Sequence, residues 1–253
     1  LLGFDVGTSE SKGTLTDLEG HVLAIASAKH GIISPYPGFA EHDPIADWMS
    51  DLKKVIRELL KQINGRPEEI AAIGISTIMA AVTFVDENCE PLRNAILYGI
   101  DTRCVKQTDE INEKIGIEKM QQEFGTICTV EHFGPKILWV KENEPEIFEK
   151  TKHITFASGF LTARLTGNYY VDKYSASSAL PMLDVKKQQW NDELCGMICS
   201  KELLPEIADS TYAVIGTVTA KAAEETGLAR GTKVICGTTD AGAEAVSVGV
   251  VKP

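Results

Sequence analysis

The sequence predicts an α/β protein in which a central sheet is flanked by helices. Apolar strand segments alternate with amphipathic helical segments along the chain, an order typical of sheets covered by helices. Residues 70–76 form an apolar run that suits a central strand buried on both faces. Between residues 48 and 63, apolar side chains recur at three- and four-residue spacing, which gives a helix one apolar face.

A strand with a single carboxylate opens the chain and leads into the turn Gly7-Thr8-Ser9. Asp5 interrupts an otherwise apolar run, and a buried carboxylate is costly unless a cation or hydrogen-bond donors meet it. Gly7 allows a ligand to approach the backbone, and the hydroxyl and N–H groups of the turn can meet phosphate oxygens. The alternative is a structural hairpin in which Asp5 caps the turn. Further strands are expected at 12–17 and 21–26.

A loop and a long helix follow this hairpin. Prolines and glycines make residues 29–43 a loop or an irregular edge. Asp43-Pro44 starts a helix over about 45–64, and Gly65 is placed as its C-terminal cap.

Tyr98, Asp101 and Arg103 follow the next group of strands. We expect a strand at 70–76, a turn at 77–81, and strands at 82–86 and 95–97. Asp101 and Arg103 lie on the same side of an extended segment, so Asp101 can bind a hydroxyl while Arg103 orients it. The alternative is a surface salt bridge at a helix start.

The middle of the chain is predicted to be mainly helical. Helices are expected at 105–115, 119–128, 135–143 and 157–165, the last capped by Gly167. Residues 132–135 are interpreted as a loop over a pocket, and Trp139 as a core residue. A strand at 169–172, small polar residues at 175–178, a strand at 215–218 and a helix at 221–226 come next.

A second stretch with a single carboxylate lies near the end of the chain. A short apolar strand over 234–236 is followed by small residues, by Asp240 and by a small-residue helix over 241–248. A carboxylate is favourable at a helix N-terminus, so a capping role is the structural alternative for Asp240.

These stretches together resemble the FGGY family of carbohydrate kinases, which includes glycerol kinase, xylulokinase and gluconokinase. The order and spacing of the segments carry the resemblance along nearly the whole chain. The segments are Phe4-Asp5-Val6-Gly7-Thr8-Ser9, Gly38-Phe39-Ala40-Glu41-His42-Asp43-Pro44 with Trp48, Ile73-Gly74-Ile75-Ser76, residues 94–103, Pro135-Lys136-Ile137-Leu138-Trp139, Leu165-Thr166-Gly167 with Asp172 and Ser175-Ala176-Ser177, and residues 237–243.

The resemblance implies a fold and a reaction. The fold is the ribonuclease-H-like domain of actin and hexokinase, with a mixed central sheet, and the reaction is ATP-dependent phosphorylation of a sugar or polyol hydroxyl. In this assignment Asp240 is the catalytic base and Asp5 helps to hold Mg²⁺ through water. Gly7, Thr8 and Ser9 face the transferred phosphate, and Lys12 assists as a point charge.

The expected substrate wall departs from the family pattern. Xylulokinase-like members carry Gln-Met-His after the strand at 70–76, and glycerol-kinase-like members carry Gln-Arg-Glu, whereas this chain has Ile78-Met79-Ala80. Only Met79 agrees with the first pattern, so neither xylulose nor glycerol follows. The resemblance implies substrate contacts by Met79, Ala80, Tyr98, Asp101 and Arg103.

Composition limits the partners. The net charge of −11 argues against nucleic-acid binding, and no apolar run is long enough to span a membrane. The six cysteines show no CxxC pair, which favours reduced thiols in a cytoplasmic protein over a zinc site.

The resemblance also implies that residues 1–253 are the N-terminal, substrate-binding domain, and that the family's C-terminal nucleotide-binding domain is absent from this chain. We therefore expect the chain alone to be inactive, and its exposed cleft face to favour self-association, with a homodimer as one outcome. A non-catalytic sugar-binding or regulatory member of the family is the alternative function. A chaperone ATPase or an actin-like filament protein is a third hypothesis, which Asp43-Pro44, Asp101-x-Arg103 and Leu165-Thr166-Gly167 disfavour.

Overall fold

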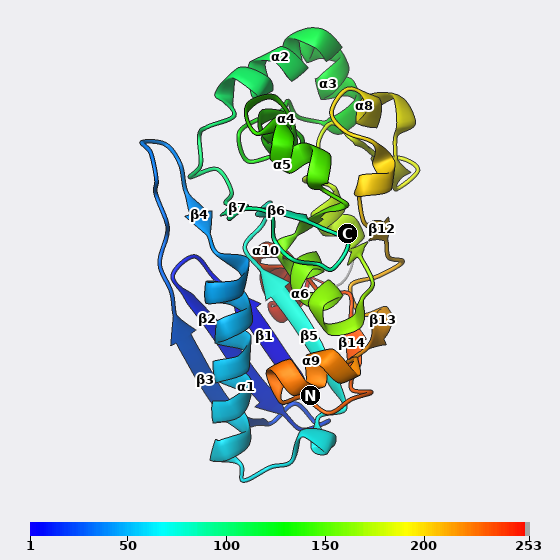
Figure 1. Cartoon of the computed structure of the whole chain (residues 1–253). Coiled ribbons are helices and arrows are strands. Elements are labelled where there is room, and N and C mark those ends of the chain that lie inside the picture. Colours follow the sequence, from blue (N-terminus) through cyan, green and yellow to red (C-terminus); the bar gives the residue numbers. More distant parts are fainter. Residues whose placement is uncertain (251–253) are drawn as a thin grey trace.

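The largest sheet of the computed structural model, which describes residues 1–250, is mixed and has seven strands (Figure 1). The strands along the sheet are β13 (Val214–Thr217), β14 (Lys233–Ile235), β5 (Ala72–Thr77), β1 (Leu2–Val6), β2 (Glu10–Thr16) and β3 (Val22–Lys29), with β15 (Thr238–Thr239) also beside β5. Strands β1, β14 and β15 run parallel to β5, while β2, β3 and β13 join antiparallel.

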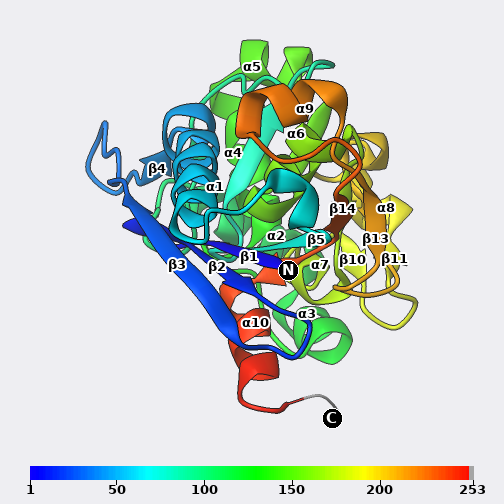
Figure 2. The ribbon, with the colours of Figure 1, turned by 90° about the horizontal axis from the view of Figure 1, so that it is seen from below.

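Helices cover both faces of this sheet. Helix α1 (Ser50–Gln62) packs on β2 and β3, and α6 (Ala157–Thr166) and α9 (Ala220–Thr226) lie on the same face. Helix α10 (Asp240–Ser247) lies on the opposite face (Figure 2). Alternate side chains of each strand face these two sides, so in β1 the apolar Phe4 is buried toward α1 while Asp5 faces the α10 side.

A smaller antiparallel sheet lies between the large sheet and a group of helices, at the top of Figure 1. It contains β4 (Glu41–His42), β7 (Ala95–Ile96), β6 (Val82–Val85) and β8 (His153–Phe156). The helices are α2 (Val105–Ile115), α3 (Ile117–Phe124), α4 (Phe133–Asn143) and α5 (Pro145–Lys150). Val82 and Phe84 pack into the core beneath these helices, whereas Val85 and Ala95 belong to the core of the large sheet. The small sheet therefore separates two hydrophobic cores.

Short elements complete the described part of the chain. They are the pairs β9 (Tyr170–Val171) with β12 (Glu206–Ile207) and β10 (Leu183–Asp184) with β11 (Gln189–Trp190), the helices α7 (Lys173–Ala176) and α8 (Asp192–Gly196), the π-helical turn Pro44–Met49, and the 3-10 turns Pro67–Glu69 and Lys201–Leu203. No helix among residues 1–250 is long and apolar enough to cross a membrane.

Several predicted boundaries are corrected by the structure. The helix expected at 45–64 begins as a π-helical turn and ends at Gln62, and Asn64, not Gly65, takes the left-handed conformation that ends it (φ 47°). The helix expected at 119–128, with its end near Gly125, is α3, which begins earlier, at Ile117; its end is confirmed, because Gly125 takes the left-handed conformation after Phe124 (φ 72°). Of the loop expected at 132–135, residues 133–135 form the first turn of α4 and His132 is the residue before it. Proline is tolerated there because an N–H in the first turn has no acceptor within the helix. Trp139 is half-buried.

Candidate active site

The turn after β1 is held from below by two buried histidines. The Gly7 N–H donates to the Glu10 carbonyl over 3.0 Å, while the N–H groups of Thr8 and Ser9 have no partner among the described residues. His30 Nε2 lies 3.0 Å from the Gly7 carbonyl, and His42 Nε2 lies 3.1 Å from the Thr8 carbonyl. Because the carbonyl oxygens are bound inside the protein, the two free N–H groups are available to an anion above the turn.

Asp5 lies beside this turn at the edge of a larger cavity. Ser76, its neighbour on β5, donates a hydrogen bond to Asp5 Oδ1 over 2.7 Å, and Lys12 is opposite it on β2. Burial raises the pKa of the Asp5 carboxyl group, and the negative charge of Asp240 adds to this rise. Oδ2 has no donor among residues 1–250. A hard cation would therefore fit here, because it would offset both the burial and the neighbouring charge.

Asp240 is brought to the site by β15 and α10. It is the first residue of α10, and Thr239 is the residue before the helix. Asp240 Oδ1 accepts a hydrogen bond from the N–H of Ala241 over 2.8 Å. Below it, the buried Asp172 caps α7 and accepts a hydrogen bond from Thr238 Oγ1 over 3.1 Å. Asp172 thus supports the segment that carries Asp240.

A cavity of about 270 Å³ joins five segments that are separate in the sequence. Its lining contains the predicted residues Thr8, Met79, Ala80, Tyr98 and Asp240, together with Ile78, Glu131 and Ala241. The Tyr98 hydroxyl lies 3.1 Å from Thr8 Oγ1 and links the turn after β1 to the far wall. A second cavity, of about 570 Å³, contains Asp5, Lys12 and Ser76 in its lining.

Asp101 and Arg103 are not brought to either cavity. Both side chains are completely buried, and Arg103 Nη2 lies 2.7 Å from Asp101 Oδ2 and 2.7 Å from Glu41 Oε1. Asp101 Oδ2 also accepts the N–H of Ala40 over 2.6 Å, and the Arg103 guanidinium stacks on Phe39 at 3.9 Å. The pair fastens the loop before β4 to the segment after Tyr98, an orienting role without the predicted hydroxyl contact.

Sequence reasoning assigned no site role to four contributors. The signal for Ser76 was present, because it ends a strand expected beside the first one. His30 and His42 carry no local pattern that points to the turn, and Glu131 lies in a loop whose position is set by tertiary contacts.

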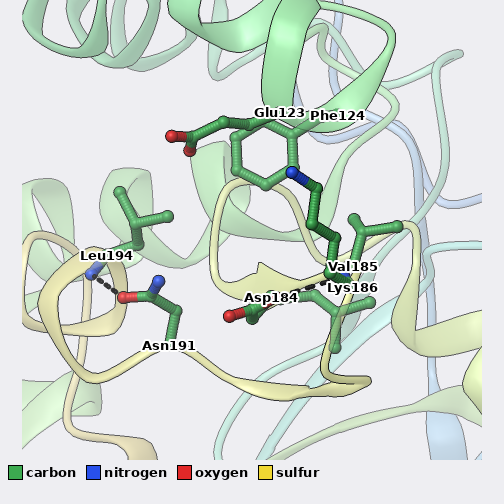
Figure 3. Close-up of a pocket in the computed structure, with 8 residues that line it drawn as sticks. Glu123, Phe124, Asp184, Val185, Lys186, Asn191 and Leu194 are labelled. Atoms are coloured by element: carbon green, nitrogen blue, oxygen red, sulfur yellow. Dashed lines mark hydrogen bonds between the residues drawn. The ribbon is translucent and has the colours of Figure 1, made fainter.

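A third hollow, of about 170 Å³, lies between α3 and the β10–β11 hairpin (Figure 3). Its polar groups serve the local backbone. Asp184 Oδ1 accepts from the N–H groups of Lys186 and Lys187, and Asn191 Oδ1 caps α8 through the N–H of Leu194. These side chains are already bonded within their own turns, so the candidate site stays at the first two cavities.

Comparisons with known proteins identify the family. The model of the FGGY family of carbohydrate kinases, N-terminal domain, matches residues 1–247. A xylulose kinase of Lactococcus lactis subsp. lactis (strain IL1403) is 34% identical over 252 residues, which cover 99% of this chain and 49% of that protein. The chain thus spans about half the length of the curated relatives it matches.

Solved structures give the same result for the fold. The crystal structure of xylulose kinase from Rhodospirillum rubrum has a TM-score of 0.92 and 28% identity, and the match covers 100% of this chain and 51% of that one. Gluconate kinase from Lactobacillus acidophilus has a TM-score of 0.84 and 27% identity over 94% of this chain and 47% of that one. The predicted actin- and hexokinase-like fold is confirmed, and the chain belongs to the FGGY family of carbohydrate kinases, whose N-terminal domain it matches.

Proposed function

We propose that this chain is the substrate-side half of a kinase that transfers a phosphoryl group from ATP to a hydroxyl of a sugar or polyol. Relatives named as xylulose, glycerol and gluconate kinases support the reaction class. One observation carries the proposal for this chain: Asp240 and Thr8 of the phosphate-facing turn line the same cavity, which is large enough for a small carbohydrate. The adenosine moiety would be bound by a second domain.

Asp240 is the proposed base. Its Oδ1 is held by the Ala241 N–H, which leaves Oδ2 to accept the proton of the substrate hydroxyl. Its place in the first turn of α10 fixes the carboxylate at the end of β15. The attacking hydroxyl would lie between Asp240 and the free N–H groups of Thr8 and Ser9, close to the phosphoryl group that it attacks.

Asp5 is the proposed Mg²⁺ residue. Mg²⁺ would neutralise charge on the phosphate oxygens when bound, and it keeps several waters, so one carboxylate suffices. Lys12, directly across from Asp5 on β2, adds a positive charge at the mouth of the same cavity. Gly7 shapes the turn, and Thr8 and Ser9 present donors to the transferred phosphate. Met79, Ala80 and Tyr98 form the proposed sugar wall.

Replacement of the proposed base provides the test. In the full-length polypeptide, we expect Asp240→Asn to lower kcat by about 10²–10⁴-fold, because the amide cannot accept the proton. Sugar affinity measured by calorimetry should stay within a few-fold. Asp209→Asn is the control, since Asp209 is exposed and outside both cavities. Normal turnover by the Asp240 variant would contradict the proposal.

The same experiment distinguishes the alternative function, a non-catalytic sugar-binding member. That alternative predicts sugar binding without ATP consumption in the parent protein. The presence of both Asp5 and Asp240 at the cavities favours the kinase.

A further inference from the structure

The sugar cavity is unusually acidic for a site that must hold a phosphorylated product. Two carboxylates, those of Asp240 and Glu131, line it, and among the described residues no Lys, Arg or His shares the lining. The other polar groups are the hydroxyls of Thr8 and Tyr98, which lie 3.1 Å apart. The cavity therefore presents two negative charges to whatever enters it.

The basic side chains near the cavity contact other groups. Lys136 is completely buried, and its ammonium donates to the carbonyls of Val130 and His132. Arg103 is buried between Asp101 and Glu41. Lys12 lines the other cavity, beside Asp5. The charge of Lys136 acts on Glu131 from a distance. Among residues 1–250, none of these three side chains forms an ion pair with the Glu131 carboxylate.

Glu131 is an exposed residue that is held at the cavity by its contact with the Gly99 segment and by bonds within its own loop. Gly99 leaves the space that it occupies, because a Cβ atom at Gly99 would lie 2.5 Å from Glu131 Cγ. The two bonds from Lys136 fix the carbonyls on either side of Glu131. Within residues 1–250 no protein group donates a hydrogen bond to the Glu131 carboxylate, so its oxygens remain available to a ligand.

The wall formed by residues 78–80 has no side chain that can donate a hydrogen bond. Ile78 and Ala80 are buried and apolar, and Met79 has no hydrogen to donate. Besides the paired hydroxyls of Thr8 and Tyr98 and the proposed base Asp240, Glu131 is the polar side chain that can bind substrate hydroxyls remote from the phosphorylated one. A carboxylate accepts hydrogen bonds from hydroxyl groups strongly, and it repels another carboxylate in a partly enclosed site.

We propose that Glu131 is a specificity-determining residue that makes the cavity select neutral polyhydroxy substrates, ketoses or alditols, and reject sugar acids. The inference rests on the proposed kinase function and narrows its substrate class. Since a site with unmatched polar groups discriminates strongly, the preference for a neutral substrate over its matching acid should reach at least about a hundredfold in kcat/KM.

The test compares matched neutral and acidic pairs, such as xylitol with xylonate and glucitol with gluconate. Ketoses with five and with six carbons are measured alongside them. ATP consumption by the full-length polypeptide gives kcat and KM for each. We expect Glu131→Gln to raise KM for the preferred neutral substrate by about tenfold with little change in kcat, because a neutral acceptor binds hydroxyls more weakly. Glu131→Arg should reverse the preference between neutral and acidic members of a pair. Glu118→Gln, on the exposed surface of α3, should match the parent.

The possible results test the role of Glu131 and the kinase function separately. A parent enzyme that prefers the acids, or a Glu131→Gln variant with an unchanged neutral-to-acid ratio, would overturn the role of Glu131 and leave the kinase function intact. If nothing is phosphorylated, the kinase proposal fails, and calorimetric binding of the same pairs then decides the selectivity. Binding of acids as tightly as neutral partners would refute it.

Discussion

At the scale of single residues, the two histidines beneath the turn after β1 differ in their hydrogen-bond partners. Both ring nitrogens of His30 face acceptors, the Asp51 carboxylate at 2.8 Å and the Gly7 carbonyl at 3.0 Å. His42 instead accepts a hydrogen bond from Trp48 Nε1 over 3.1 Å, which leaves its proton on Nε2 for the Thr8 carbonyl. His42 is therefore held neutral.

Burial, reinforced by the neighbouring charge of His30, lowers the pKa of His42 to about 4. In the unfolded chain the histidine pKa is near 6.5. At a pH between about 4 and 6.5, His42 is therefore protonated in the unfolded chain and neutral in the folded one. Stability from this group is therefore complete above about pH 6.5 and is lost as the pH falls toward 4. At pH 5 the loss should be about 2 kcal/mol. Urea unfolding at pH 7.5 and 5.0 measures it.

His42→Gln should remove that part of the pH dependence, because glutamine does not titrate and its amide can still donate to Thr8. His21→Gln, at an exposed position, should keep the parental difference between the two pH values. An equal difference in the His42 variant would show that another group is responsible.

Single residues of the site were predictable where a lone carboxylate stood in or after an apolar run. Asp5 interrupts the first such run and Asp240 follows the last, and the structure places both beside the turn. Asp101 and Arg103 formed an equally clear pattern, yet they are buried against each other, because a sequence does not show which polar groups find partners inside the protein. Glu131 was missed for the related reason that its position depends on Lys136 and Gly99.

At the scale of elements, the short strand β15 determines where Asp240 lies. Gly237 precedes β15 with φ 75°, and a Cβ atom there would lie 2.1 Å from the Ile75 carbonyl oxygen. The close approach to β5 lets Thr238 and Thr239 pair with Ser76 and Thr77. The carboxylates of Asp5 and Asp240 thus depend on one backbone contact for their relative position.

Gly237→Ala should lower the free energy of unfolding by at least about 3 kcal/mol, from the left-handed conformation and the displaced strand together. Gly227→Ala is the matched control. Gly227 also has a positive φ, 81°, but a Cβ atom there would meet nothing within 4 Å, so about 1–2 kcal/mol is expected. Urea denaturation compares the two, and equal losses would show that the contact with Ile75 is unimportant.

Helices and strands with strong periodicity were predictable, and their ends were not. The apolar face of α1 was clear, but its last turn could end at Asn64 or Gly65, since both residue types tolerate the left-handed conformation. The start of α4 was mistaken for a loop because Gly134-Pro135 usually breaks a helix, whereas a first turn accepts both. The assembly of the small sheet depends on contacts distant in sequence, which periodicity does not report.

At the scale of the whole molecule, ligand binding should be visible as stabilisation. The candidate sugar cavity is formed entirely by residues of this chain, so a preformed half-site predicts binding without a second domain. A sugar at about a hundred times its dissociation constant should add about 2.7 kcal/mol. For a chain of this size the Tm would rise by roughly 5–10 °C.

A thermal-shift series of pentoses, hexoses, ketoses, sugar acids and polyols measures this effect. Asp240→Asn should shift with the same sugar, because binding does not need the base. No shift with any compound, in this chain and in the full-length polypeptide alike, would contradict the sugar cavity. The homodimer stays a prediction, although exposed Val22, Leu23 and Ile25 on the edge strand β3 offer apolar surface for it.

The two hydrophobic cores divided by the small sheet have a consequence for how this protein could diverge. The turn after β1, Asp5 and Asp240 rest on the core of the large sheet, while the loop that carries Glu131 is anchored by Lys136 on α4, in the other core. Substitutions that repack the second core are therefore expected to leave the proposed catalytic groups undisturbed. Such an arrangement allows ligand preference to change during evolution while the catalytic residues are kept. In a directed-evolution library, the helices around the second core are therefore the part to diversify.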